Sequence, residues 1–146
     1  MHQHVQTQSP DRHPLLDEHT RTQGVEGCFE AEVACVACAD ACLAEDDIPA
    51  LRRCIRANLD CADIAGATAR MLARTLGDER LLRAQVEACA RALSACAEAC
   101  NEHAGHNDPC RECAEACRIA AERCGAVLRE LPDAWGQTHP KTPSAE

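Results

Sequence analysis

Large aromatic side chains are almost absent from this 146-residue chain, which has one Phe, one Trp and no Tyr. A protein core is normally built on such side chains together with Leu, Ile and Val. Here the aliphatic residues are modest in number, whereas Ala is abundant and there are 13 cysteines. Because free cysteine behaves as a small polarizable apolar residue, we expect thiols to fill much of the interior of a single domain.

Positive charge and long apolar runs are also scarce. The formal net charge is -9, which argues against a nucleic-acid partner and suits a protein that collects cations. No apolar run approaches the 18 residues of a membrane span, so we expect no membrane association.

The first 24 residues lack the charged start, apolar stretch and cleavage site of an export signal, and they have no twin arginine. We therefore expect a cytoplasmic protein, in which cysteines serve metal or redox chemistry more often than disulfides. The odd cysteine count would also leave one thiol unpaired in any fully intramolecular disulfide scheme.

Four helical segments are predicted between two polar ends. We expect residues 1–24 to be flexible, with a short turn near 15–19, and the proline-rich residues 132–146 to be a disordered tail. Helices are predicted over about 25–45, 49–76, 79–104 and 109–131, with Asp78 and Asp108 as N-caps. Because the connections are short, residues 25–131 are predicted to form an all-α, antiparallel four-helix bundle.

The cysteines follow helical spacing throughout this region. Successive gaps within each segment are 3, 4 or 7 residues, which keeps the side chains on one helix face. The sequence CVACADAC (35–42) is matched by CRECAEAC (110–117) and echoed by CAEAC (96–100). The predicted core stripe comprises Cys28, Cys35, Cys38, Cys42, Cys54, Cys61, Cys89, Cys96, Cys100, Cys110, Cys113, Cys117 and Cys124.

Thiols at this spacing predict binding of a soft metal, and several Cu(I) ions in particular. Side chains three or four residues apart on a helix have Cβ atoms about 5–6 Å apart, so two sulfurs can reach one ion. Each Cu(I) displaces about one thiol proton, so the net charge of the core stays near zero as copper is loaded. Four thiolates around each Zn(II) would instead leave two negative charges per site, which a dry core resists.

Three other interpretations stay open. The chain could be a zinc or iron–sulfur protein, although the ferredoxin run C-x2-C-x2-C-x3-C-P does not occur. It could be a thiol redox buffer, which would need exposed cysteines beside positive charge, or a purely structural bundle. We find no nucleophile–base pair and no glycine-rich phosphate loop, so we do not expect an enzyme.

The two ends of the bundle should differ. Antiparallel helices bring Cys42, Cys54, Cys100 and Cys110 to one end, near the acidic residues Glu45, Asp46, Asp47 and Asp108. His103 and His106 are predicted there as ligands at a mouth where copper enters. Asn58 should face the stripe. The other histidines, His2, His4, His13, His19 and His139, are expected to be solvated.

The opposite end is predicted to be a closed apolar plug. It would hold the fold without metal and consist of Ile64, Ala65, Thr68, Met71, Leu72, Leu81, Leu82, Val86, Val127, Leu128 and Leu131. Met71 is expected to belong to this plug rather than to act as a thioether ligand.

The C-x2-C-x3-C helices at 35–42 and 110–117 resemble those of the bacterial copper storage proteins, and the resemblance covers roughly residues 25–131. It implies Cu(I) ions held inside the bundle by the stripe cysteines, with histidines at the open end, here His103 and His106. It also implies a homotetramer. The missing export signal points to the cytosolic branch of the family, in which a copper chaperone is a candidate donor. The segment 49–76 departs from the pattern because it has only two cysteines, Cys54 and Cys61.

Overall fold

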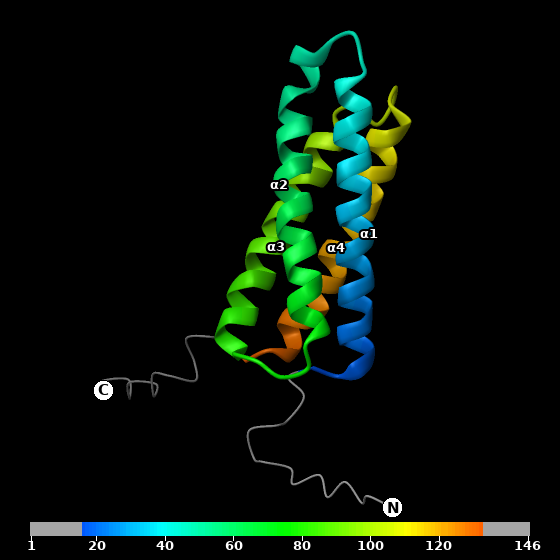
Figure 1. Ribbon diagram of the computed structural model, residues 1–146. Coiled ribbons are helices and arrows are strands. Elements are labelled where there is room, and N and C mark those ends of the chain that lie inside the picture. The colour runs from blue at the N-terminus through cyan, green and yellow to red at the C-terminus, as the bar shows by residue number, and fades with distance from the viewer. Residues whose placement is uncertain (1–15, 133–146) are drawn as a thin grey trace, which may run out of the picture.

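The computed structural model describes residues 16–132, which form four antiparallel helices (Figure 1). These are α1 (Glu18–Leu43), α2 (Ile48–Ala73), α3 (Glu79–Asn101) and α4 (Asp108–Glu130). The predicted all-α four-helix bundle is confirmed. The flexible segment expected for residues 1–15 and the tail expected for residues 133–146 lie outside the described residues.

The first helix begins earlier than the sequence pattern predicted. Its N-cap is Asp17, whose carboxylate accepts hydrogen bonds from the backbone N–H groups of His19 at 3.1 Å and Thr20 at 3.4 Å. Residues 18–24 are therefore helical rather than flexible. Gly24 does not interrupt the helix because it is buried against the other helices, where packing outweighs its low helix propensity.

Two other helix boundaries also differ from prediction. The second helix ends at Ala73 and the third at Asn101, each three residues before its predicted end. The N-cap of α4 is Asn107, whose side-chain oxygen accepts the backbone N–H of Cys110 at 3.0 Å. The prediction that Asp108 caps this helix was wrong, since Asp108 is the first helical residue and Pro109 the second.

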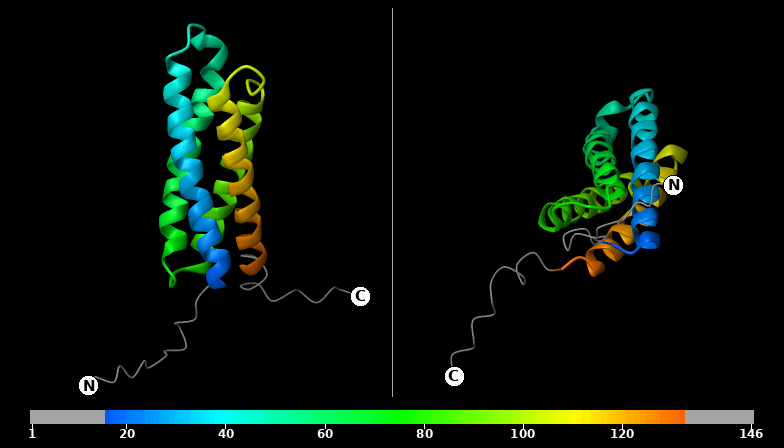
Figure 2. Two further views of the ribbon diagram at one scale, coloured as in Figure 1. Left: turned by 90° about the vertical axis from the view of Figure 1, so that its right-hand side faces the viewer. Right: turned by 60° about the horizontal axis from the view of Figure 1, so that its bottom comes forward.

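The helices form a ring in which α1 contacts α2 and α4, and α3 contacts the same two helices. The α1–α2 and α3–α4 connections lie at one end, called here the mouth end. The α2–α3 connection, the start of α1 and the end of α4 lie at the other, called the deep end (Figures 1 and 2). This arrangement points one face of every helix at a shared axis.

Thiols and a few aliphatic residues fill the space around this axis. The largest fully buried apolar side chains are Leu72, Leu93, Val86 and Val127. The predicted plug at the deep end is largely confirmed, but Leu81 is 61% exposed and Met71 is only half-buried. Leu93, which the sequence reasoning did not assign to the core, lies within it.

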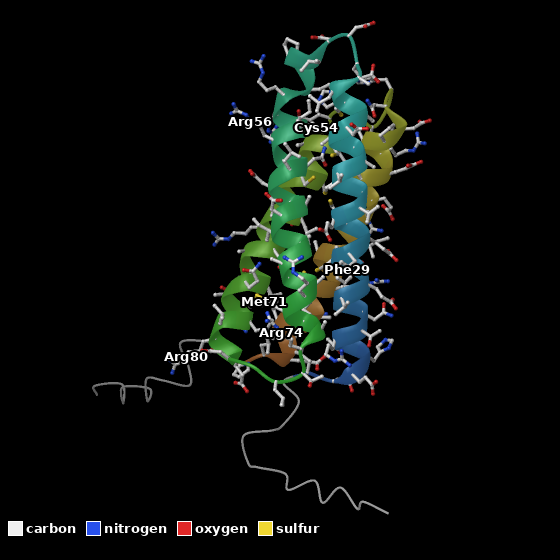
Figure 3. The ribbon with its side chains drawn as sticks, viewed as in Figure 1. Phe29, Cys54, Arg56, Met71, Arg74 and Arg80 are labelled. Carbon is white, nitrogen blue, oxygen red and sulfur yellow. The ribbon has the colours of Figure 1, made fainter. Side chains whose placement is uncertain are left out.

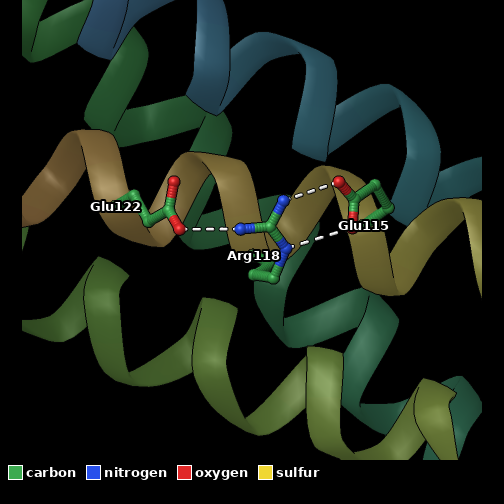
Figure 4. A network of polar contacts seen from close by, with 3 residues as sticks. All are labelled: Glu115, Arg118 and Glu122. Atoms are coloured by element: carbon green, nitrogen blue, oxygen red, sulfur yellow. Dashed lines mark hydrogen bonds and ion pairs between the residues drawn. The ribbon is translucent and has the colours of Figure 1, made fainter.

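Charged side chains pair on the outside of the bundle, both between α2 and α3 and within α4. Arg53 of α2 pairs with Glu102 and, at 3.9 Å, with Glu98 near the end of α3. On α4, Arg118 binds the carboxylates of Glu115 at 2.6 Å and Glu122 at 2.7 Å (Figure 4). Such exposed pairs contribute at most about 1 kcal/mol each, so the bundle depends on its core. Within residues 16–132, no helix is both long and apolar enough to cross a membrane.

Candidate metal centre

All 13 cysteines are buried free thiols, and their side chains lie inside the bundle as predicted. Cys54 is at most 1% exposed and the other twelve are fully buried. Figure 3 shows Cys54 toward the mouth end, whereas Met71 lies toward the deep end. The helical spacing of 3, 4 and 7 residues therefore places every thiol on a core-facing stripe.

The sulfur atoms gather into groups whose members all lie within 4.8 Å of one another. We name three of them by position, and a fourth set links the first two. These are the mouth group (Cys38, Cys42, Cys54, Cys110), the middle group (Cys35, Cys61, Cys96, Cys117), the deep trio (Cys28, Cys89, Cys124) and the linking set (Cys38, Cys100, Cys113).

The repeated cysteine motifs on α1 and α4 lie against each other in antiparallel fashion. The sulfur of Cys35 is 3.5 Å from that of Cys117 and 3.7 Å from that of Cys113. At the other end of the motifs, Cys110 lies 3.7 Å from both Cys38 and Cys42. The sequence repeat thus produces one continuous cluster of sulfurs between two helices.

Asn58 occupies the place in α2 that cysteines hold in the neighbouring helices. It is fully buried, and its side-chain oxygen accepts hydrogen bonds from the thiols of Cys113 at 3.0 Å and Cys96 at 3.1 Å. Its amide nitrogen donates to Cys54 at 3.4 Å. Asn58 therefore bridges the mouth and middle groups, and its predicted orientation toward the stripe is confirmed.

Hydrogen bonds among the thiols decide where negative charge is stabilised. Bonds from Cys124 and Cys28 lower the pKa of Cys89 to about 4 against the opposing effect of burial. Neighbouring thiols, Cys100 foremost, likewise lower the pKa of Cys38 and the pKa of Cys96. Each sulfur group therefore contains one thiol prepared to act as an anionic ligand.

The remaining thiols mostly hold their protons more tightly. Burial raises the pKa of Cys42 to about 12, and burial is also the main cause of the raised pKa of Cys110. A cation that enters the bundle would have to displace these protons to form further thiolate bonds.

A hollow of about 270 Å³ lies at the mouth end. His103 and His106 lie together there with their ring centroids 5.7 Å apart, although both follow the end of α3 rather than continuing its stripe. The hollow is lined by these histidines together with Glu45, Asp46, Asp47, Ala50, Leu51 and Asn107.

Two residues that line this hollow are hydrogen-bonded to helix turns that carry cysteines. The N–H of His103 donates to the carbonyl of Cys100 at 3.0 Å, and Asn107 caps the helix turn that carries Cys110. Sequence reasoning missed Asn107, although an Asn two residues before a Pro is a recognisable cap signal. Cys54 and Cys100, with sulfurs 3.4 Å apart, lie at this end as predicted.

Three other sequence-based expectations have mixed outcomes. Asp108 does not line the hollow and instead pairs with Arg111 at 2.9 Å. His19 is exposed in the first turn of α1, as expected. Met71 packs at the edge of the plug, where it is half-buried and lines a small depression at the deep end with Leu82 and other residues. His2, His4, His13 and His139 lie outside the described residues.

Such an arrangement is suited to soft metal ions. Deprotonated thiols select Cu(I), zinc or iron–sulfur clusters, and a four-sulfur group could also surround one Zn(II). Because the mouth and middle groups are linked through Cys38, Cys100 and Cys113, their sulfurs can bridge neighbouring ions rather than serve separate closed sites.

Comparison with known proteins agrees with this chemistry. The protein is similar to the cytosolic copper storage protein Ccsp of Streptomyces lividans, whose structure was solved with 10 copper equivalents. The two are 43% identical, with a TM-score of 0.77 over 79% of this chain and 88% of that chain. The Cu(I)-bound copper storage protein BsCsp3 is 28% identical, with a TM-score of 0.67 over 75% of this chain and 98% of that chain.

A curated relative and a family profile give the same result. The uncharacterized cysteine-rich protein YhjQ of Bacillus subtilis (strain 168) is 32% identical over 103 residues, which are 70% of this chain and 91% of the relative. The profile described as "Copper storage protein" matches residues 17–129, which include all four helices but for the last residue of α4. The chain therefore belongs to the copper storage protein family.

Proposed function

We propose that this protein stores several Cu(I) ions inside its bundle, bound mainly by cysteine thiolates, and so keeps them from harmful reactions. The observation that carries the proposal is the continuous cluster formed by the mouth group, the middle group and the linking set. Structural packing alone would not require thiols at ten adjoining core positions, since alanine or valine would fill them. Burial would also shield bound copper from water and oxygen.

Charge favours Cu(I) over zinc in this setting. Copper can fill the cluster with about one displaced proton per ion, whereas each four-thiolate zinc site would add two negative charges to a buried region. In the described residues no lysine or arginine is among the buried residues that could offset such charge. The thiol redox alternative has less support because its cysteines would need to be exposed, and none is.

The hollow at the mouth end is the proposed route for copper. His103 and His106 offer imidazole ligands beside Glu45, Asp46 and Asp47, whose negative charge attracts a cation. We infer that the ion passes from these groups to the mouth group, and that a copper chaperone is a candidate donor. A cytosolic location is proposed as well, by analogy with the Streptomyces relative.

A homotetramer is proposed on the basis of the outer face of α1. Phe29, Val33, Val36 and Leu43 are 41–68% exposed and recur at intervals of 4, 3 and 7 residues, so they form one apolar stripe facing away from the core. Such a stripe suits contact with a second copy of the chain.

Charged substitutions test this oligomer. The double variant Val33→Glu, Val36→Glu should reduce the mass in solution below that of a tetramer, as measured by light scattering after size exclusion. Ala88→Glu on the outer face of α3 is the matched control and should leave the mass unchanged. An unaltered mass for the double variant would contradict the proposed interface.

The storage function is tested by anaerobic Cu(I) titration of reduced protein against a chromophoric chelator. The protein should withhold roughly ten or more ions per chain before the chelator colours. Protein whose thiols were alkylated in the unfolded state is the control and should withhold almost none. Retention of only one or two ions would refute storage. The same reduced protein would then be titrated with zinc and iron.

A further inference from the structure

The deep trio stands apart from the other ten sulfurs. Within it, Cys28 lies 4.0 Å from Cys89 and 3.9 Å from Cys124. In residues 16–132, no sulfur–sulfur contact joins the trio to another group. On each helix the next cysteine toward the mouth is seven residues away, a rise of about 10 Å.

A layer without sulfur fills this gap. It consists of Ala31, Ala65, Leu93 and Ala120, one from each helix, and all four are fully buried. Leu93 stands three residues before Cys96, so on α3 it takes the first position of the C-x2-C-x3-C motif that α1 and α4 complete. The four residues together interrupt the column of thiols, and Leu93 is the one large side chain among them.

The opposite side of the trio is closed by hydrocarbon. Leu72, Val86 and Val127 are all fully buried at the deep end. The trio is therefore enclosed along the bundle axis by apolar layers, and neither layer offers a metal ligand.

The sulfur spacing matches one three-coordinate ion. With metal–sulfur bonds of about 2.3 Å, three sulfurs around a planar ion lie about 4.0 Å apart, whereas two sulfurs on either side of a linear ion lie about 4.6 Å apart. The observed distances of 3.9 and 4.0 Å agree with the triangular arrangement.

The second helix supplies no fourth sulfur at this level. Its residue here is Thr68, which is fully buried. The Thr68 hydroxyl donates to the carbonyl of Ile64 at 2.7 Å and accepts from the side-chain amide of Gln85 at 3.0 Å. Because the hydroxyl already makes two hydrogen bonds and is not a soft ligand, α2 adds no sulfur to the three of the trio.

We propose that Cys28, Cys89 and Cys124 form an insulated site that binds one Cu(I) ion through three sulfurs, independently of the clusters nearer the mouth. The inference rests on the proposed storage function. It adds that the stored copper is divided into a shared cluster and one separate ion, and that Leu93 and its layer maintain the division.

The test counts the ions lost when the trio is removed. The variant Cys28→Ala, Cys89→Ala, Cys124→Ala should withhold one ion fewer per chain in the chelator titration, with the rest of the titration curve unchanged. The matched control replaces three members of the middle group, Cys35, Cys61 and Cys117, by alanine. Because those sulfurs are shared between ions, the control should lose more than one ion and alter the affinity of those that remain.

Several outcomes would overturn the proposal. Loss of two or three ions, loss of none, or a changed affinity of the remaining ions in the trio variant would each show that the trio is not a separate one-ion site. If the triple variant does not fold, Cys124→Ala gives the same information, because it should weaken one ion only. Should the unsubstituted protein withhold almost no copper, the storage function fails first, and the two failures are distinguishable.

The role of Leu93 is tested separately. Leu93→Cys completes the motif on α3 and should connect the trio to the cluster, whereas Leu93→Ala removes the same bulk without adding a thiol. Removing the trio should then cost more than one ion in the Leu93→Cys background and still only one in the Leu93→Ala background. Equal losses in the two backgrounds would contradict the insulating role of Leu93.

Discussion

At the scale of single residues, the thiols of the core act as weak hydrogen-bond donors to the side-chain oxygen of Asn58. Asn58 accepts from Cys96 and Cys113 and donates to Cys54, so both ends of its buried amide are satisfied. Without these bonds the amide would carry a desolvation penalty of about 1–3 kcal/mol. The thiols therefore make it possible to place an amide in the middle of the sulfur cluster.

Replacing this amide should weaken the apoprotein. Asn58→Ala removes the hydrogen bonds and leaves a small cavity, so the free energy of unfolding should fall by about 1–3 kcal/mol. Anaerobic urea unfolding measures it. The exposed Asn101→Ala serves as control and should change stability by less than about 0.5 kcal/mol. A similarly small effect at Asn58 would mean that its bonds to thiols contribute nothing.

The mouth histidines should affect the rate of loading more than the capacity. The double variant His103→Ala, His106→Ala removes both imidazoles but leaves the thiol groups intact. We expect Cu(I) transfer from a chelator to slow at least several-fold while most ions are still bound, measured as a time course of chelator absorbance. His19→Ala, at the opposite end, is the control. An unchanged rate in the double variant would remove the histidines from the proposed route.

At the scale of helices, Gly24 and Gly66 both lie where an added Cβ would meet a side chain of a neighbouring helix, but the two obstacles differ. An added Cβ at Gly24 would lie 3.1 Å from a methyl of Leu72 and 3.3 Å from one of Val127. Both neighbours are fully buried and cannot move aside. At Gly66 the obstacle is the carboxylate of Glu32, which ends a flexible, only partly buried side chain.

Replacing the two glycines by alanine should therefore have different effects on the free energy of unfolding. Gly66→Ala gains about 1 kcal/mol of helix propensity and requires only that Glu32 rotate, so it should be neutral or stabilising. Gly24→Ala gains the same propensity but crowds the core, at a cost of about 1–3 kcal/mol. Thermal unfolding of the two apoproteins compares them directly. Equal stabilisation of both would contradict the tight contact at Gly24.

The helices and their inward faces could be predicted from the cysteine spacing. Gaps of 3, 4 and 7 residues match the repeat of an α-helix and not the two-residue repeat of a strand. The helix ends were less predictable, since Asp17 and Asn107 act through hydrogen bonds that several nearby polar residues could have made. The grouping of sulfurs across helices could not be predicted, because it depends on the axial shift between neighbouring helices. Leu93 was not recognised as a break in the column for the same reason.

At the scale of the whole molecule, the buried thiols couple folding to pH. An unfolded cysteine ionises near its ordinary pKa of 9.0, whereas burial raises the pKa of Cys42 to about 12. This contribution to stability is complete below pH 9 and is lost as the pH rises toward 12, because the unfolded chain releases a proton that the folded chain retains.

Anaerobic urea unfolding of the apoprotein at pH 8, 9 and 10 should therefore show stability falling above pH 9. The loss is at most about 1.4 kcal/mol per pH unit for each thiol that stays protonated in the fold. A variant in which Cys42 is alanine should show a shallower decline. Constant stability from pH 8 to 10 would mean that the thiols ionise as readily in the bundle as in the unfolded chain.

The scarcity of aromatic rings in the core has a spectroscopic consequence. Phe29 is 41% exposed, and Trp135 lies outside the described residues. Near-ultraviolet circular dichroism normally distinguishes an ordered core from a molten one by the fixed environment of aromatic side chains. Among residues 16–132 the buried core contains no aromatic side chain, so a weak near-ultraviolet signal from this part of the chain would not indicate disorder. Bands that grow in this region during loading would instead report the formation of metal–sulfur bonds.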